Sequence, residues 1–337
     1  MKEGLIYICI LGWRVEFLSE MLLTIRGLKT HFFTSLGVVR AVDGVSLEIN
    51  RGETVGLVGE SGSGKSMTAF SVMRLVRKPG RIVQGEILFE GEDLLKKNEG
   101  EMRKMRGNRL AMSFQDPMTY LNPVIRVGNQ IAEAVMLHQG DSRSQAMDKA
   151  IESMELVRIP SAADRARDFP HQLSGGMRQR VLIAIAICCK PDLLIADEPT
   201  TALDVIITGE ILRLLEDLKK RLNLSILVIS HDLSVVAELA DKVAVTYAGR
   251  ILEYADTMEI FKRPLHAYTR GLMESIPRLD SAKGRLKVLD GSTPDMVSLP
   301  TGCRFHPRCP YVKDICTKEM PELVEVEKGH MVACHIA

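Results

Sequence analysis

The sequence predicts an α/β fold in which buried strands alternate with helices. Two short runs, Leu193–Ala196 and Ile226–Ser230, are almost wholly apolar, as strands covered on both faces are. Helical patterns at Gly209–Leu222 and Leu233–Leu239 come after these runs. This alternation of short apolar strands and helices is typical of α/β proteins.

Size and composition exclude several classes of protein. The chain has 337 residues, of which 46% are hydrophobic, so it is too apolar for a disordered chain and long enough for a large core. The net charge of +1 offers no general attraction to nucleic acid, and we expect no nucleic-acid partner. The longest apolar runs, Gly4–Trp13 and Val181–Cys189, are shorter than the roughly 20 residues of a membrane-spanning helix. We therefore expect a soluble, cytoplasmic protein.

The pattern of elements divides the chain into three parts. Residues 1–20 do not lead into the strand pattern that begins at Met21, and they are expected to be an N-terminal arm or an upstream start. Residues 21–258 carry the α/β pattern and contain a helical insertion at about 116–172. In residues 259–337, prolines break the chain into short pieces, so we expect a small irregular domain with little core of its own. The expected strands before the insertion are 22–28, 41–49, 54–58 and 85–89.

A phosphate-binding motif comes directly after the expected strand at 54–58. Residues Gly59–Ser66 read G-x-x-x-x-G-K-S and precede a helical pattern. Such glycines let backbone N–H groups curl around phosphates at a helix N-terminus, while Lys65 reaches the β- and γ-phosphates and Ser66 ligates Mg²⁺. The alternative, a flexible Gly/Ser loop, rarely lies between such a strand and helix. The residues expected to contact ATP here are Gly59, Glu60, Ser61, Gly62, Ser63, Gly64, Lys65, Ser66 and Met67.

A pair of carboxylates ends the apolar strand at 193–196. Asp197 would lie beside the phosphate loop and hold hydrated Mg²⁺, and Glu198 could accept a proton from an attacking water. Taken alone, Asp-Glu after a strand is usually a solvated strand end. The phosphate motif reverses that interpretation.

A third motif, Leu173-Ser-Gly-Gly-Met-Arg-Gln-Arg180, precedes the carboxylate strand. Ser174 can cap the following helix, and Gly175 and Gly176 expose its N-terminal N–H groups. In this order the motifs resemble those of the ATPase subunits of ABC transporters. The resemblance implies an ABC ATPase core with an antiparallel β subdomain and a helical subdomain. It also implies that ATP lies between the phosphate loop of one subunit and residues 174–176 of its partner.

The resemblance assigns roles to further residues. Gln115 matches the Q-loop, as a catalytic residue and Mg²⁺ ligand, and His231 matches the switch histidine, as a further catalytic residue besides Glu198. Asp204 ends a D-loop in which Thr201 replaces the more usual serine. Taken singly, Gln115 would be a capped turn and His231 a core histidine. For the aromatic residue that stacks on adenine we choose Phe33, with Phe32 as the reserve.

Four stretches resemble one subfamily, the oligopeptide/dipeptide importers; they are 114–123, 245–250, 266–271 and 300–310. The resemblance implies a subunit on the cytoplasmic face of a prokaryotic membrane. Its partners would be a second ATPase subunit (a homologue or another copy), two transmembrane permeases and, indirectly, an extracellular solute-binding protein. Nickel or sugars are alternative solutes.

A soluble ABC ATPase of DNA repair or translation is the alternative class. Repair types carry a very long coiled-coil insertion, whereas only residues 66–173 separate Lys65 from Ser174. Translation types usually carry two cassettes in one chain, and this chain carries one. Transport is therefore favoured.

Four thiols lie in the tail: Cys303, Cys309, Cys316 and Cys334. Four is the number required by tetrahedral zinc or a four-iron cluster, and the spacing does not choose between them. His306, His330 and His335 keep zinc open. The subfamily resemblance implies a [4Fe-4S] cluster, which would staple this domain structurally. We expect the phosphate loop to belong to a separate core, so that ATP binding does not depend on the cysteines.

Overall fold

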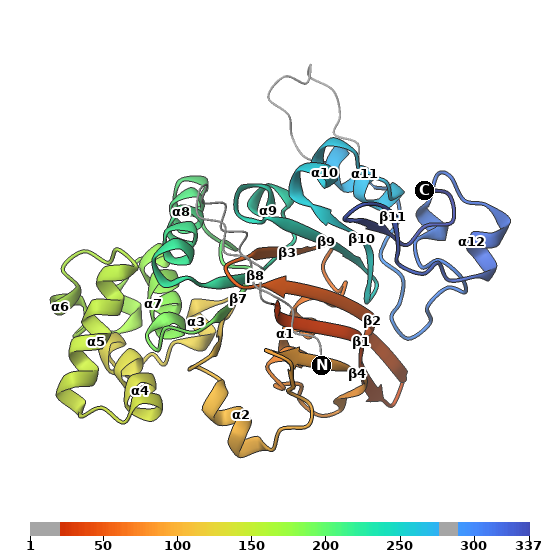
Figure 1. The fold of residues 1–337 in the computed structure, drawn as a ribbon. Helices are drawn as coiled ribbons and strands as arrows, with labels where there is room; N and C mark the ends of the chain where they lie inside the picture. Colours follow the sequence, from red (N-terminus) through yellow and green to blue (C-terminus); the bar gives the residue numbers. More distant parts are fainter. Residues whose placement is uncertain (1–20, 276–288) are drawn as a thin grey trace, which may run out of the picture.

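The computed structural model describes residues 21–275 and 289–337, so the expected arm at 1–20 lies outside the described residues. Two sheets form the body of the protein, and the helices α4 (Val127–Gln139), α5 (Arg143–Leu156) and α6 (Ala162–Arg165) lie together at one side of it (Figure 1). These helices fall within the predicted helical insertion at 116–172.

The smaller sheet is the antiparallel β subdomain that the resemblance implied. Its strand order is β2-β1-β4-β5, and β1 pairs antiparallel with both β2 and β4. Its strands are longer than the apolar patterns predicted, because pairing continues into the polar ends of β1 and β2. The bounds are β1 Met21–Thr34, β2 Gly37–Asn50, β4 Gly80–Phe89 and β5 Glu92–Asp93.

The larger sheet has eight strands in the order β11-β12-β10-β9-β3-β8-β7-β6. β3 (Thr54–Val58), β7 (Leu193–Asp197) and β8 (Ser225–Ser230) are buried along their whole length and run parallel with one another. The prediction of strands covered on both faces is confirmed for β7 and β8, and β3 is buried in the same way. The phosphate loop and the carboxylate pair lie at the carboxyl ends of β3 and β7, at one edge of this sheet.

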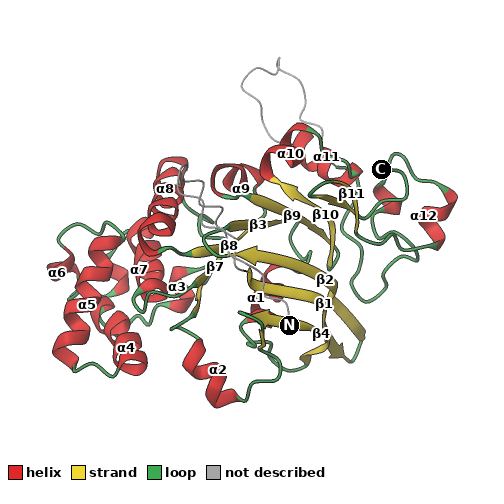
Figure 2. Cartoon of the chain, viewed as in Figure 1, coloured by secondary structure: helices red, strands yellow, loops and turns green. Residues whose placement is uncertain are grey.

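Helices flank this sheet, and strands gather at the centre of the molecule (Figure 2). α1 (Lys65–Val72) begins at the phosphate loop, α7 (Gly175–Ile187) begins at the third motif, and α8 (Val205–Leu222) begins directly after Asp204. The remaining bounds are α2 Glu99–Met105, β6 Leu110–Ser113, α3 Pro117–Tyr120, α9 Leu233–Leu239, β9 Lys242–Tyr247, β10 Arg250–Asp256, α10 Thr257–Lys262, α11 Ala267–Glu274, α12 Asp314–Lys318, β11 Val324–Glu327 and β12 His330–Val332.

The C-terminal residues share the core of the larger sheet. β12 pairs with β10 and β11 pairs with β12, so the sheet continues into the tail. Phe305 is fully buried in the same hydrophobic cluster as Val58 of β3 and Leu194 of β7. The expectation that the tail and the phosphate loop belong to separate cores is therefore wrong. Sequence patterns could not show this, because the tail's apolar residues are too dispersed to have a period.

Candidate active site

The phosphate loop folds as its glycines require. Gly64 has φ of 100°, and a Cβ there would lie 2.2 Å from the carbonyl oxygen of Ala41. A Cβ at Gly59 would lie 2.1 Å from the carbonyl oxygen of Thr246. The loop thus packs its backbone directly against β2 and β9, which leaves room only for glycine at these two positions.

Lys65 lies over this loop with its side chain buried. Its Nζ donates hydrogen bonds to the carbonyl oxygens of Gly59 (2.7 Å) and Glu60 (2.9 Å). Burial lowers the pKa of Lys65, while the nearby carboxylates of Glu198 and Asp197 oppose that shift. The ammonium is therefore held at the place where the phosphates of a nucleotide would enter.

Ser66 and Asp197 form the predicted pair for Mg²⁺. The Ser66 hydroxyl donates a hydrogen bond of 3.0 Å to Oδ1 of Asp197, which ends β7 and is 4% exposed. Burial raises the pKa of Asp197 to about 6, and the Ser66 hydrogen bond opposes the shift. A hydroxyl and a carboxylate are oxygen ligands of the kind Mg²⁺ prefers, and a cation would offset the cost of burying the carboxylate. The pair fits Mg²⁺.

Glu198 is the point where the predicted catalytic residues meet. Its Oε2 accepts a hydrogen bond of 2.7 Å from Nε2 of Gln115 and lies 3.2 Å from Nδ1 of His231. The hydroxyl of Thr201 donates a third contact of 2.7 Å to the same oxygen. Three elements therefore converge on one carboxylate oxygen. The contact from Gln115 is made to Glu198, and its role as an Mg²⁺ ligand stays a prediction.

The third motif and the D-loop contact each other. Ser174 caps α7, as predicted, by accepting a hydrogen bond from the N–H of Met177 (3.3 Å). Asp204 caps α8 by accepting from the N–H of Ile207 (2.9 Å). A Cβ at Gly176 would lie 2.9 Å from the side chain of Ile207, so the two helix starts pack closely. The roles of Ser174, Gly175, Gly176 and Asp204 toward a partner's nucleotide remain predictions.

The two aromatic candidates for adenine differ in their surroundings. Phe33 is 40% exposed, and the guanidinium of Arg81 lies over its ring at 4.2 Å from the centroid. Phe32 lines a hollow of about 350 Å³ together with Met67 and Phe70 of α1. An exposed ring suits stacking on a base, and Phe33 remains the predicted residue.

Three contacts at this site were not predicted. Thr201 was assigned only as a variant of the D-loop pattern, although its position three residues after Glu198 could have suggested the contact. The N–H of Glu60 donates to the hydroxyl of Tyr268 in α11 (2.9 Å), and the carboxylate of Glu60 pairs with Arg308 in the tail. The partners of Glu60 are more than two hundred positions away in the sequence, and no local sequence pattern predicts these contacts.

The four tail cysteines lie in one region but are not arranged as metal ligands. Across 21–275 and 289–337, no group of three or more His, Cys, Asp or Glu side chains is placed to hold a metal ion. The N–H of Cys303 donates to the carbonyl oxygen of Cys316 (2.8 Å). Burial raises the pKa of Cys303 to about 11, with smaller contributions from Cys316, Cys334 and Cys309. The expected metal-stapled domain is therefore not found in this arrangement.

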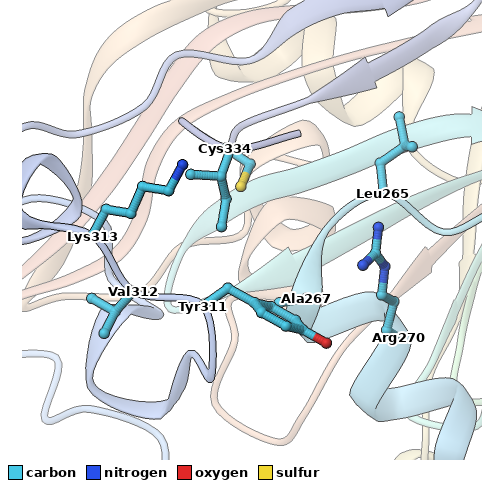
Figure 3. Close-up of a pocket in the computed structure, with 8 residues that line it drawn as sticks. Leu265, Ala267, Arg270, Tyr311, Val312, Lys313 and Cys334 are labelled. Atoms are coloured by element: carbon cyan, nitrogen blue, oxygen red, sulfur yellow. The ribbon is translucent and has the colours of Figure 1, made fainter.

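The three histidines considered as possible zinc ligands contact other groups. A ring nitrogen of His306 lies 2.9 Å from the carbonyl oxygen of Cys303, that of His330 lies 2.8 Å from the Glu253 carboxylate, and that of His335 lies 2.9 Å from the carbonyl oxygen of Glu319. Cys334 itself lines a hollow of about 490 Å³ (Figure 3).

No helix in the described part of the chain is long and apolar enough to cross a membrane.

Comparisons with known proteins show the class to which the chain belongs. The model of the family "ABC transporter" matches residues 42–201, and that of "Oligopeptide/dipeptide transporter, C-terminal region" matches residues 252–316. A bacterial ABC transporter cassette solved as a dimer has a TM-score of 0.63 at 24% identity, covering 70% of this chain and 99% of its own. A subunit of an ABC transporter complex from Clostridium perfringens has a TM-score of 0.62 at 25% identity, covering 72% of this chain and 92% of its own. The fold is thus that of an ABC-type ATPase.

The relatives narrow this class. An oligopeptide transport ATP-binding protein of Bacillus subtilis, AppD, is 48% identical over 316 residues, or 94% of this chain and 96% of the relative. The corresponding protein of Escherichia coli, OppD, is 45% identical over 316 residues, or 94% and 93%. The chain belongs to the family of ATP-binding subunits of oligopeptide and dipeptide ABC transporters.

Proposed function

We propose that this chain hydrolyses ATP to power the import of peptides through a membrane ABC transporter. The observation that carries the hydrolysis is the convergence of Gln115, Thr201 and His231 on the carboxylate of Glu198, next to the Ser66–Asp197 pair. Peptides as the solute are supported by the names of the relatives that match most of the chain. A role in DNA repair or translation has no such support.

The residues of the site divide the chemistry among them. Lys65 and the backbone N–H groups of Gly59–Gly64 bind the phosphates. Ser66 and Asp197 would hold Mg²⁺, which when bound would neutralise part of the phosphate charge. Glu198 accepts the proton of the attacking water, and its three partners hold the carboxylate in place through Oε2. Gln115 follows β6 and His231 follows β8, so a displacement of either segment would change the contacts of Glu198.

The partners are inferred from the presence of one phosphate loop and one third motif in the chain. ATP bound between the phosphate loop of one subunit and Ser174–Gly176 of another would close a dimer, and hydrolysis would reopen it. The second ATPase is a homologue or another copy, and two permeases carry the solute. An extracellular binding protein delivers the solute. The chain acts at the cytoplasmic face of the membrane.

Reconstitution tests this proposal. The chain, purified with its permeases and solute-binding protein, should hydrolyse ATP faster when the binding protein carries a peptide, and labelled peptide should accumulate in vesicles only with ATP. Stimulation by nickel or a sugar in place of a peptide would overturn the choice of solute. ATP hydrolysis that no solute changes, with binding to DNA or ribosomes, would overturn transport itself.

We also propose that Cys303, Cys309, Cys316 and Cys334 bind a [4Fe-4S] cluster. Support comes from four free thiols within one short tail and from the backbone hydrogen bond that joins Cys303 to Cys316. The four thiols would have to come closer to one another to bind one cluster. Anaerobically purified protein should contain about four irons and four sulfides per chain. One zinc per chain without sulfide would replace the cluster by a zinc site.

A further inference from the structure

The tail contacts the phosphate loop through an ion pair. The guanidinium of Arg308 donates two hydrogen bonds to the carboxylate of Glu60, Nη1 to Oε2 at 2.8 Å and Nη2 to Oε1 at 3.0 Å. The side chain of Arg308 is 6% exposed. Two parallel hydrogen bonds in a buried setting fix the orientation of the Glu60 side chain as well as its distance from Arg308, whereas an exposed ion pair does not.

Both partners of this ion pair are fixed by other contacts. Arg308 also donates from Nε to the carbonyl oxygen of Asp290 (2.9 Å) and from Nη1 to the hydroxyl of Tyr247 (3.3 Å). Glu60 donates its N–H to the hydroxyl of Tyr268 (2.9 Å). The tail and α11 therefore hold Glu60 by its side chain and by its backbone.

A second arginine reaches the support of the same loop. Arg304, which is buried, donates to the carbonyl oxygen of Ala248 and pairs with Asp43. The next residue, Gly249, donates its N–H to the carbonyl oxygen of Ser63 in the phosphate loop (2.9 Å). Arg308 thus contacts the loop directly, and Arg304 contacts the residues that support it.

A buried aromatic residue lies between these arginines in the sequence. The ring centroid of Phe305 is 5.4 Å from that of Tyr247 and 5.4 Å from that of Tyr268. Both tyrosines also contact the ion pair, since Tyr247 accepts from Arg308 and Tyr268 accepts from Glu60. Undocking the segment would expose a large apolar side chain, which favours the docked arrangement.

Glu60, which is held by the tail and α11, in turn contacts other residues of the phosphate loop. Its carbonyl oxygen accepts hydrogen bonds from the N–H of Ser63 (3.2 Å) and from Nζ of Lys65 (2.9 Å). A displacement of Glu60 would therefore move the phosphate-binding lysine and the turn that presents backbone N–H groups. Preorganised donors bind an anion better than donors that must first be ordered.

We propose that Arg308 is a positioning residue for the phosphate loop, and that the segment Cys303–Cys309 makes nucleotide affinity depend on how the cysteine tail is docked. This inference rests on the proposed ATP binding at that loop. It replaces the expectation that ATP binding is independent of the tail. Because coupling between two sites is reciprocal, ATP should in turn stabilise the docked tail by the same factor.

Nucleotide binding by the full chain is the first test. Arg308→Ala should weaken ATP affinity about tenfold, or about 1.4 kcal/mol, and raise KM for ATP while kcat changes less than about twofold. Arg308→Lys, which keeps the charge but cannot donate from two separate nitrogens to the Glu60 carboxylate, should have an intermediate affinity. The matched control is Arg263→Ala, which removes an exposed ion pair with Glu327 in the same part of the molecule. Unchanged affinity in Arg308→Ala would overturn the inference. Absence of ATP binding by the unmodified chain would overturn the proposed function instead.

A double variant separates position from charge. Removing Arg308 also leaves the carboxylate of Glu60 unpaired near the phosphates, and its repulsion alone could weaken binding. In Arg308→Ala with Glu60→Gln that charge is gone. Affinity that stays low supports positioning, whereas a return to the original affinity would overturn it.

Hydrogen exchange measures the reciprocal effect, the stabilisation of the docked tail by ATP, and it can be measured in the unmodified chain alone. ATP should slow exchange of the backbone amides of residues 303–309 in the unmodified chain, and slow it less in Arg308→Ala. Exchange of these amides that is the same with and without ATP, in a chain that binds ATP, would contradict the coupling.

Discussion

Glu198→Gln tests the centre of the site most directly. The substitution keeps the size of the side chain and an oxygen that can accept from Gln115 and Thr201, so the surrounding hydrogen bonds can persist. It removes the charge that makes the carboxylate a base. Loss of a general base costs about 10²–10⁴-fold in rate, or about 2.7–5.4 kcal/mol. We expect hydrolysis to fall by that factor.

The affinity for ATP should not fall together with the rate of hydrolysis in this variant. Glu198 is one of the carboxylates whose charge acts on Lys65, so removing it leaves less negative charge near the phosphates. ATP affinity should therefore stay the same or increase. Phosphate release at saturating ATP and binding of a fluorescent nucleotide would measure the two effects separately.

The control is Glu216→Gln, which changes an exposed residue of α8 that pairs with Lys220. It should alter neither quantity. Turnover by Glu198→Gln within about threefold of the unmodified chain would show that another group takes the proton, and the role assigned to Glu198 would be wrong.

Three further predictions concern the neighbouring residues. Thr201→Val removes one of the three contacts to Oε2 of Glu198 and should lower kcat about fivefold, since a net hydrogen bond contributes about 1 kcal/mol; an unchanged kcat in steady-state assays would make that contact irrelevant to turnover. Lys65→Ala removes the charge facing the phosphates and should abolish detectable ATP binding at micromolar nucleotide in titration calorimetry, a result that normal affinity would refute. The pKa of Asp197 is raised from 3.8 to about 6, so the folded state binds a proton at this carboxyl group more tightly than the unfolded state does. The resulting contribution to the free energy of unfolding is present below about pH 4 and is lost as the pH rises to about 6. Urea unfolding without nucleotide or Mg²⁺ should show a fall of up to about 3 kcal/mol over that range, which Asp197→Asn should lack; equal pH profiles for both proteins would contradict the raised pKa.

The local parts of the fold could be read from the sequence. The strands β3, β7 and β8 coincide closely with their predicted ranges because strands buried on both faces are mostly apolar and therefore easy to recognise as runs. α8 begins at Val205, earlier than the apolar pattern at 209, because Asp204 caps it. Such a cap is a local signal that the hydrophobic period does not contain.

The tail was the part that sequence reasoning placed least well. Prolines and dispersed apolar residues indicated a small domain held together by metal. Instead, β12 pairs with β10 and Phe305 enters the core of the larger sheet. A short strand that completes an existing sheet needs no hydrophobic period of its own, because its partner strand supplies the pairing.

The sequence by itself predicted the phosphate loop and the carboxylates Asp197 and Glu198, because each is a contiguous motif directly after an apolar strand. Ser66 and Asp197 lie 131 positions apart, and only the tertiary structure brings them together. Tertiary structure alone decided which side chains converge on Glu198 and which hold Glu60. Arg308 and Glu60 are separated by 248 positions, and Phe305 of the same segment as Arg308 packs against both Tyr247 and Tyr268. Packing of that kind depends on the shapes of distant side chains, which no local spacing encodes.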